Sequence, residues 1–172
     1  MASQVTYTNL FSESRNNVVA LITSSNVSDP TLSSAEFRKW IYSREPDVKA
    51  TDFSGYPFII VHPVDLDIEG EDGKGSLDGK SKFVFWDVEI EIITSDRGYG
   101  EKDGTGLTNM DTISNNLIKT FMNITNRNTL STNSMKFVNP TTTSVGNEVI
   151  ENELVYRRSI ILSFKSRIQV SA

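Results

Sequence analysis

The 172-residue sequence contains no cysteine and one histidine, His62. Without cysteine the chain has no disulfide, thiolate zinc site or cysteine nucleophile. With one histidine, a two-histidine metal site is excluded and a Ser-His-Asp triad would depend on His62 alone. This residue stands between Val61 and Pro63 in an apolar run. We therefore expect His62 to have a structural role.

Long apolar runs and a surplus of basic residues are also missing. No stretch approaches the ~20 residues of a membrane-spanning helix, and the segment MASQVTYTNLFSESR lacks the basic head and apolar run of a secretory signal. The net charge is −5 and the isoelectric point is near 4.9, whereas nucleic-acid-binding domains usually have a basic face. We expect a soluble protein of the cytoplasm that neither spans a membrane nor binds nucleic acid.

Apolar spacing and capping signals predict three helices. The first runs from about Tyr7 to Thr23. Its apolar stripe comprises Tyr7, Leu10, Phe11, Val18, Leu21 and Ile22. Ser33 followed by Glu36 is a capping box, which predicts a short second helix from Ser34 to about Arg44.

The third predicted helix begins at Thr108, with Asp111 as its capping partner. Its apolar stripe comprises Met110, Ile113, Leu117, Phe121 and Ile124. The polar segment TNRNTLSTNS that follows predicts no regular element.

Four segments are typical of β-strands. Phe58–Ile68 is rich in β-branched residues, and Pro57 and Pro63 predict an edge strand or a bulge at His62-Pro63. KFVFWDVEIEIIT is a second strand, which we expect to form a hairpin with the first. On its apolar face lie Val84, Trp86, Val88, Ile90 and Ile92. Met135–Asn139 and LVYRRSIILSFKSRI complete the set. In the last strand, one face carries Leu154, Tyr156, Ile160, Leu162, Phe164 and Ile168.

These elements predict one α+β domain over residues 1–172, with a mixed or mostly antiparallel sheet and amphipathic helices packed on one face. The polar face of one long strand is acidic (Asp87, Glu89 and Glu91), and that of the last strand is basic (Arg157, Lys165 and Arg167). Opposite charges on neighbouring strands are mildly favourable. We therefore expect these strands to be neighbours, within one subunit or across a subunit boundary.

Two glycine-rich loops suggest ligand sites but depart from the known patterns. In the loop 98–106, Gly98 and Gly100 fit a dinucleotide fingerprint, but Asp103 occupies the sixth place and the loop ends Gly-Leu-Thr rather than Gly-Lys-Ser/Thr. The hairpin tip opens like a calcium loop, with Asp65-x-Asp67-x-Glu69-Gly70, but its twelfth position is Ser76. We expect both loops to contact partners, and we expect no catalytic centre, metal or cofactor.

The residues predicted to contact partners fall into two groups. The loop residues are Glu69, Glu71, Asp72, Lys74, Asp78, Arg97, Tyr99, Glu101, Lys102 and Asp103. The strand-face residues expected at a subunit interface are Asp87, Glu89, Glu91, Arg157, Lys165 and Arg167.

The order of the motifs carries a resemblance that spans nearly the whole chain. An N-terminal amphipathic helix, the Tyr56-Pro57 start of a strand and a hairpin with a long tip are followed by FVFWDVEIEIITSD, the helix NMDTISNNLIKTFMN and the strand ELVYRRSIILSFKSRI. In this order the sequence resembles the tail terminator (tail completion) and neck proteins of long-tailed phages. The family shares no fixed functional residues, so none is transferred to this chain.

The resemblance implies a virion protein, assembled in the host cytoplasm, that forms a hexameric ring at the head–tail junction. Its partners would be copies of itself, the tail tube protein and the head-completion or connector protein. DNA would pass through without specific binding, since an acidic channel repels phosphate. The residues alone leave a different alternative open, a soluble ligand- or calcium-binding module that uses the acidic 65–78 loop.

Overall fold

The computed structural model describes residues 6, 8–25, 27–32, 38–68, 81–97 and 106–169. Within them, six strands form one sheet in the order β1-β2-β3-β6-β4, with β5 also paired to β6. The elements along the chain are α1 (Leu10–Ser24), β1 (Ile41–Tyr42), β2 (Phe58–Ile68), β3 (Ser81–Ser95), α2 (Gly106–Met122), α3 (Ile124–Thr132), β4 (Lys136–Thr142), β5 (Gly146–Ile150) and β6 (Glu153–Gln169). The predicted α+β class is confirmed.

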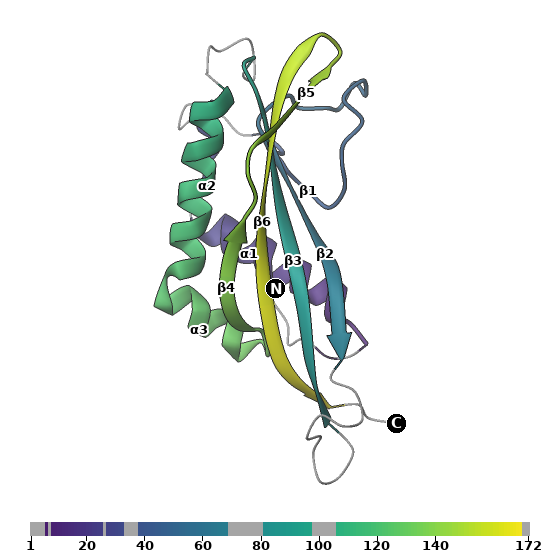
Figure 1. Cartoon of the computed structure of the whole chain (residues 1–172), viewed down its shortest axis with the longest axis vertical. Helices are drawn as coiled ribbons and strands as arrows, with labels where there is room; N and C mark the ends of the chain where they lie inside the picture. Colours follow the sequence, from purple (N-terminus) through teal and green to yellow (C-terminus); the bar gives the residue numbers. More distant parts are fainter. Residues whose placement is uncertain are drawn as a thin grey trace.

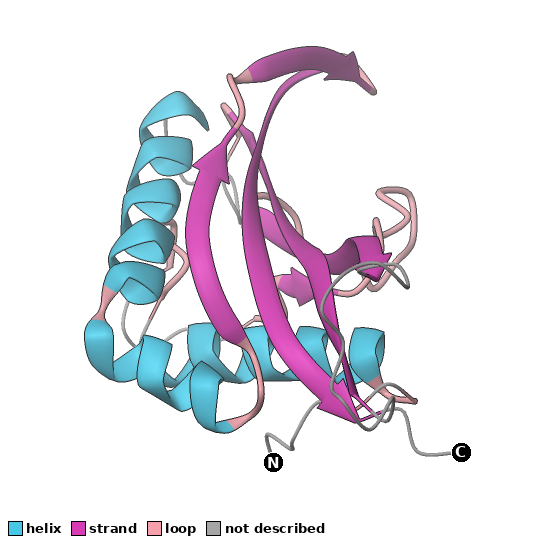
Figure 2. Cartoon of the chain, turned by 60° about the horizontal axis from the view of Figure 1, so that its bottom comes forward, coloured by secondary structure: helices cyan, strands magenta, loops and turns pink. Residues whose placement is uncertain are grey.

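The helices gather on one side of a curved sheet (Figures 1 and 2). All pairs in the sheet are antiparallel except β1 with β2, which is parallel over two residues. Alternate residues of β3 and β6 face α2, and those predicted for β3 are fully or almost fully buried. The main core therefore lies between the helices and one face of the sheet, as the alternation predicts.

Both long predicted helices form, but among the described residues each departs from its predicted stripe at one position; Tyr7 lies outside the described residues. Phe11 of α1 is 47% exposed, and Ile124 is 68% exposed. Helix α2 ends at Met122, and the side chain of Asn123 caps α3 by accepting hydrogen bonds from the backbone nitrogens of Thr125 and Asn126. The chain changes direction there, so Ile124 leaves the α2 stripe.

The start of α2 also differs from the capping prediction at Thr108 and Asp111. The helix begins at Gly106, whose nitrogen donates to Asp96 Oδ1 at 2.9 Å. A Cβ on Gly106 would lie 2.6 Å from the Tyr156 ring. Glycine therefore permits the close contact between the helix start and β6, and the Asp111 carboxylate instead accepts a bond from Arg158.

The predicted helix Ser34–Arg44 is wrong over its described residues. Residues 38–40 are not helical, and Ile41–Tyr42 forms β1 beside Ile59 and Ile60. The capping pattern itself, Ser33 and Glu36, lies outside the described residues. Tertiary contacts override the local signal here, because Trp40 is buried and its carbonyl accepts a 2.8 Å bond from Ile59.

Two elements have no counterpart in the sequence prediction. Helix α3 covers most of the polar segment TNRNTLSTNS and buries Leu130 alone among its residues. Asn133, directly after α3, connects it to α1: its Nδ2 donates a hydrogen bond to Asn17 Oδ1 at 2.8 Å. Strand β5 exposes four of its five residues. Neither element has the apolar periodicity that a sequence pattern can reveal.

The strand predictions hold with small changes. β2 has the predicted bounds, and its register shifts between Pro63 and Leu66, which confirms a bulge next to the proline. β4 continues past Asn139 to Thr142 with its own shift at Pro140. In β6, Tyr156, Ile160, Leu162 and Phe164 pack against the main core as predicted. Leu154 is 37% exposed instead, and Val155 is buried on the other face.

The face of the sheet that points away from α2 is not uniformly polar. Part of it carries a second apolar cluster, formed by Tyr56, Phe58, Ile60, Ile93 and Val155 with Tyr42, Phe53 and Ile150 against it. The Phe58 ring meets those of Tyr42 and Phe53 edge-on at about 5.7 and 5.6 Å. The segment between β1 and β2 thus covers part of this face.

A buried arginine anchors that segment. Arg38 lies 2.5 Å from Asp29, and both side chains are almost fully buried. The same guanidinium donates to the carbonyl oxygens of Ser54 and Gly55 at 3.0 and 2.6 Å, and to that of Pro57. One side chain therefore joins the chain after α1 to the start of β2.

We expect Arg38→Met to lower the free energy of unfolding by about 3–5 kcal/mol, because it leaves the Asp29 carboxylate buried without a counter-charge. Urea denaturation followed by circular dichroism measures this. Arg44→Met is the matched control; Arg44 is exposed, and its loss should cost less than about 0.5 kcal/mol. Equal losses in the two variants would contradict the anchoring role.

Candidate interaction surfaces

The two charged strand faces lie side by side in one chain. β3 and β6 are antiparallel neighbours from Ser81–Gln169 to Ser95–Val155, which confirms that the strands adjoin. Glu91 stands opposite Ser159 and Asp87 opposite Ser163. Arg157 therefore meets Glu91 diagonally across the two strands and not as a direct cross-strand pair.

Arg157 is the centre of this polar face. Its Nη1 donates to Glu91 at 2.9 Å, its Nη2 to Glu45 and its Nε to Glu148. These carboxylates come from β3, from the chain after β1 and from β5. Burial works to lower the pKa of Arg157, but the hydrogen bonds to the three glutamates outweigh it and raise the pKa. Arg157 thus stays charged and connects three parts of the fold.

The other predicted strand-face residues have different surroundings. Lys165 Nζ lies 4.8 Å from the ring centres of both Phe83 and Phe85, a cation–π arrangement. Glu89 pairs with His62 at 3.2 Å, in keeping with the structural role expected for the histidine. Asp87 is half-buried and Arg167 is exposed.

This arrangement changes the prediction for the two charged faces. Both rows lie on one face of one sheet, and Arg157 uses its charge within the chain. The rows therefore do not form two separate surfaces that can meet head to tail. A role of their residues at a subunit interface stays a prediction.

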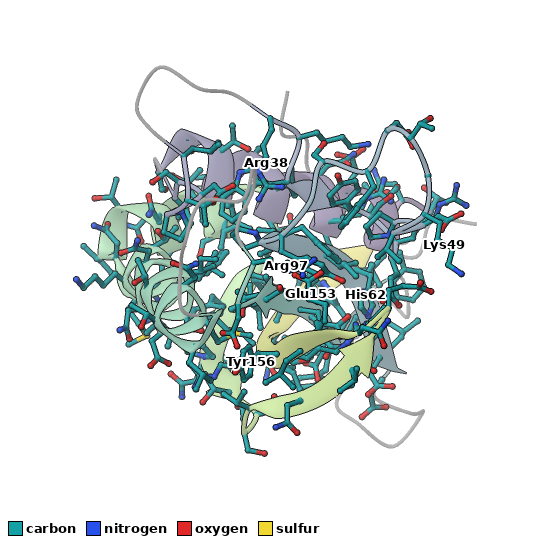
Figure 3. All side chains as sticks on the ribbon, turned by 90° about the horizontal axis from the view of Figure 1, so that it is seen from above. Arg38, Lys49, His62, Arg97, Glu153 and Tyr156 are labelled. Carbon is teal, nitrogen blue, oxygen red and sulfur yellow. The ribbon has the colours of Figure 1, made fainter. Side chains whose placement is uncertain are left out.

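Of the predicted loop contacts, only Arg97 lies among the described residues. Arg97 is exposed at the end of β3, and its backbone nitrogen donates to Ser95 Oγ at 2.9 Å. Ser95 Oγ in turn donates to the Glu153 carboxylate, and Arg97 and Glu153 lie together at this end of the sheet (Figure 3). The remaining loop residues (Glu69, Glu71, Asp72, Lys74, Asp78, Tyr99, Glu101, Lys102 and Asp103) are outside the described residues.

A cleft of about 810 Å³ lies between α1 and the segment 39–53, and no sequence pattern indicated it. Its lining carries three basic residues, Arg15 from α1 and Lys39 and Arg44 from the segment, and three acidic ones, Glu45, Asp47 and Asp52. Tyr42 and Phe53 add aromatic surface. Predicting a helix over residues 34–44 concealed the cleft, because Lys39 and Arg44 then had no defined relation to α1. The basic residues Lys39 and Arg44 are visible in the sequence, but no pattern in it places them beside α1.

The described residues carry no other recognisable chemical site. Among them, no group of three or more His, Asp or Glu side chains is placed to hold a metal ion. Nor, in that part of the chain, does any helix have the length and apolar character needed to cross a bilayer.

Comparison with known proteins leaves the chain without a family assignment. No protein-family model matches its sequence, and no curated protein matches it either.

Replacing Arg157 tests its role as a structural connector. We expect Arg157→Met to lower the free energy of unfolding by about 2 kcal/mol, because three glutamates lose a charged donor and repel one another. Urea denaturation at neutral pH measures the loss. Lys119→Met, at an exposed position of α2, should stay within about 0.5 kcal/mol of the wild type. An Arg157→Met variant with the same free energy of unfolding as the wild type would show that the network adds no stability.

Tyr56 gives the fold a sensitivity to alkaline pH. Burial, with a smaller contribution from Glu153, raises its pKa to about 12 from an ordinary value of 10.0. Below pH 10 the phenol is protonated in both the folded and the unfolded state. Between pH 10 and 12 the unfolded state loses this proton first, so the stability falls as pH rises.

We expect the wild type to lose about 1–2 kcal/mol more than Tyr56→Phe between pH 10 and 12. Chemical denaturation at a series of pH values measures the difference, and the comparison with the phenylalanine variant removes the effect of the other titrating groups. Parallel stability curves for the two proteins would contradict the assignment to Tyr56.

Proposed function

We propose that this chain is a structural assembly protein and not an enzyme. It forms a ring at the head–tail junction of a long-tailed phage, where it ends the tail tube and docks it to the neck. In this proposal the protein resides in the virion and assembles in the host cytoplasm. Its partners are further copies of itself, the tail tube protein and the head-completion or connector protein.

The order of the observed elements supports this proposal most directly. Helix α1, the hairpin of β2 and β3, helix α2 and the long terminal strand β6 follow one another along the chain. The resemblance to tail terminators rests on this order. A broad sheet backed by helices on one side is also a rigid frame from which loops can contact neighbours.

The polar groups inside the frame support a structural role as well. Arg38 bonds to Asp29 and backbone carbonyls, Arg157 to three glutamates and His62 to Glu89. Each set connects different segments of the chain. A ring of chains with net charge −5 would also be acidic as a whole, which disfavours the capture of duplex DNA.

Assembly in the presence of tail tubes tests the proposal. We expect the purified protein to form a closed ring, in a concentration series by native mass spectrometry or on adding tubes of the phage that encodes it. Electron micrographs should then show the ring at one end of each tube. A bare tube preparation is the control.

A protein that stays monomeric at every concentration and leaves tubes uncapped would exclude the ring. A melting temperature that rises with calcium and falls with a chelator would instead support the calcium-binding alternative at residues 65–78.

A further inference from the structure

We propose that β5 pairs in antiparallel fashion with β5 of a second copy of this chain, with Val149 opposite Val149 of the second copy. The two sheets then join edge to edge through their β5–β6 hairpins. This inference goes beyond the proposed function. A contact between two identical surfaces closes on two copies, whereas a ring needs two different surfaces.

Strand β5 offers a regular edge for such pairing. It pairs with β6 on one side, residue for residue, from Gly146–Arg157 to Ile150–Glu153, without the proline and the register shift found in β2 and β4. Along its other side lies no strand of the described part of the chain. Four of its five residues are exposed, and the hairpin curves over at one end of the sheet (Figure 1). This edge is therefore accessible to another chain.

The turn after β5 determines which backbone groups face this edge. Both residues of the turn 151–152 have positive φ, 50° and 66°, which is typical of a two-residue type I′ hairpin. The flanking residues Ile150 and Glu153 then form the first hydrogen-bonded pair, and bonded and non-bonded pairs alternate from there. The backbone N–H and C=O groups of Val149 and Asn147 therefore point away from β6. No described residue bonds to them.

The side chains of the hairpin leave one face apolar and uncovered. Val149 lies directly opposite Leu154 on β6, and the two are 71% and 37% exposed. The other face is occupied within the chain, because Ile150 packs against the second apolar cluster and Glu148 bonds to Arg157. The hairpin is thus held in place on one face and presents an apolar cross-strand pair on the other.

A second copy supplies both the matching edge and the matching side chains. An antiparallel edge is complementary to itself, since a two-fold rotation brings each N–H opposite a C=O. With Val149 at the two-fold axis, two valines and the two flanking Leu154 side chains form one apolar row across four strands, and such neighbours stabilise a sheet. This register places Glu148 opposite Ile150. A register centred on Glu148 would instead bring two glutamates together, which is unfavourable.

Single cysteines measure this contact directly, because the chain has no cysteine of its own. The Cα atoms of a hydrogen-bonded antiparallel pair are about 5.5 Å apart, a distance that a disulfide spans. We expect Val149→Cys to form a disulfide-linked dimer under mild oxidation, seen on a gel without reductant. In the proposed register two copies of residue 147 are roughly 13 Å apart along the strand. Asn147→Cys, the matched control on the same edge, should therefore remain monomeric.

A charge at the same position tests the contact without oxidation. Val149→Lys places two ammonium groups opposite each other, and we expect the dimer to dissociate at a concentration at least about tenfold higher than for the wild type. Sedimentation over a concentration series measures the change, and circular dichroism checks folding. The control Val138→Lys alters another exposed valine, 46% exposed on β4, and should dimerise like the wild type.

Two results would overturn the pairing. The first is equal cross-linking at positions 147 and 149, which random collision produces. The second is a Val149→Cys variant that folds and stays monomeric under oxidation, as expected if a different protein occupied this edge.

Tube capping by the same preparations separates this inference from the proposed function. A chain that caps tubes but shows no cross-link at position 149 would overturn the pairing and leave the ring proposal standing. A chain that cross-links at position 149 but not at 147, and that leaves tubes bare and forms no ring, would support the pairing and contradict the ring.

Discussion

The pairing of β3 with β6 is the interaction on which the rest of the structure depends. All 15 residues of β3 have a partner on β6. The opposite edge of β6 carries β4 and β5 in succession. This register sets which side chains face α2 and which face outward, because a shift by one residue would exchange the two faces. The main core, the Arg157 network and the Gly106–Tyr156 contact all depend on it.

The parts of the fold that the sequence predicts are those with strong local periodicity. Alternation along β3 and β6 predicts both their faces, and the stripes of α1 and α2 predict their burial. Helix α3 was missed because it buries only Leu130 and depends on the Asn123 cap and bonds to α1. The false helix at 34–44 arose from a valid capping pattern. Burial of Arg38 and Trp40 and pairing of β1 prevail over that local preference.

The candidate surfaces were likewise predictable only where a local sequence pattern places their residues. The acidic and basic rows were predictable as neighbours, because alternation along each strand places like charges on one face. Arg157 was identified, but its partners Glu45 and Glu148 were not, since Glu45 is 112 residues away in the chain and Glu148 lies on β5, which was not predicted. The cleft could not be predicted at all. It exists because Arg38 fixes the segment before β2, through contacts with residues 9 to 19 positions away.

Strand β4, and strand β2 beyond its two-residue pairing with β1, are poor templates for adding another strand. β2 contains Pro63 and β4 contains Pro140, and each has a register shift beside its proline. Where β4 stops, the hydroxyl of Thr143 accepts a bond from the Ser159 nitrogen at 2.9 Å in place of a strand carbonyl. These interruptions protect the sheet from edge-to-edge aggregation. When two copies of this chain meet at these strands, their sheets are therefore hindered from joining into one continuous sheet.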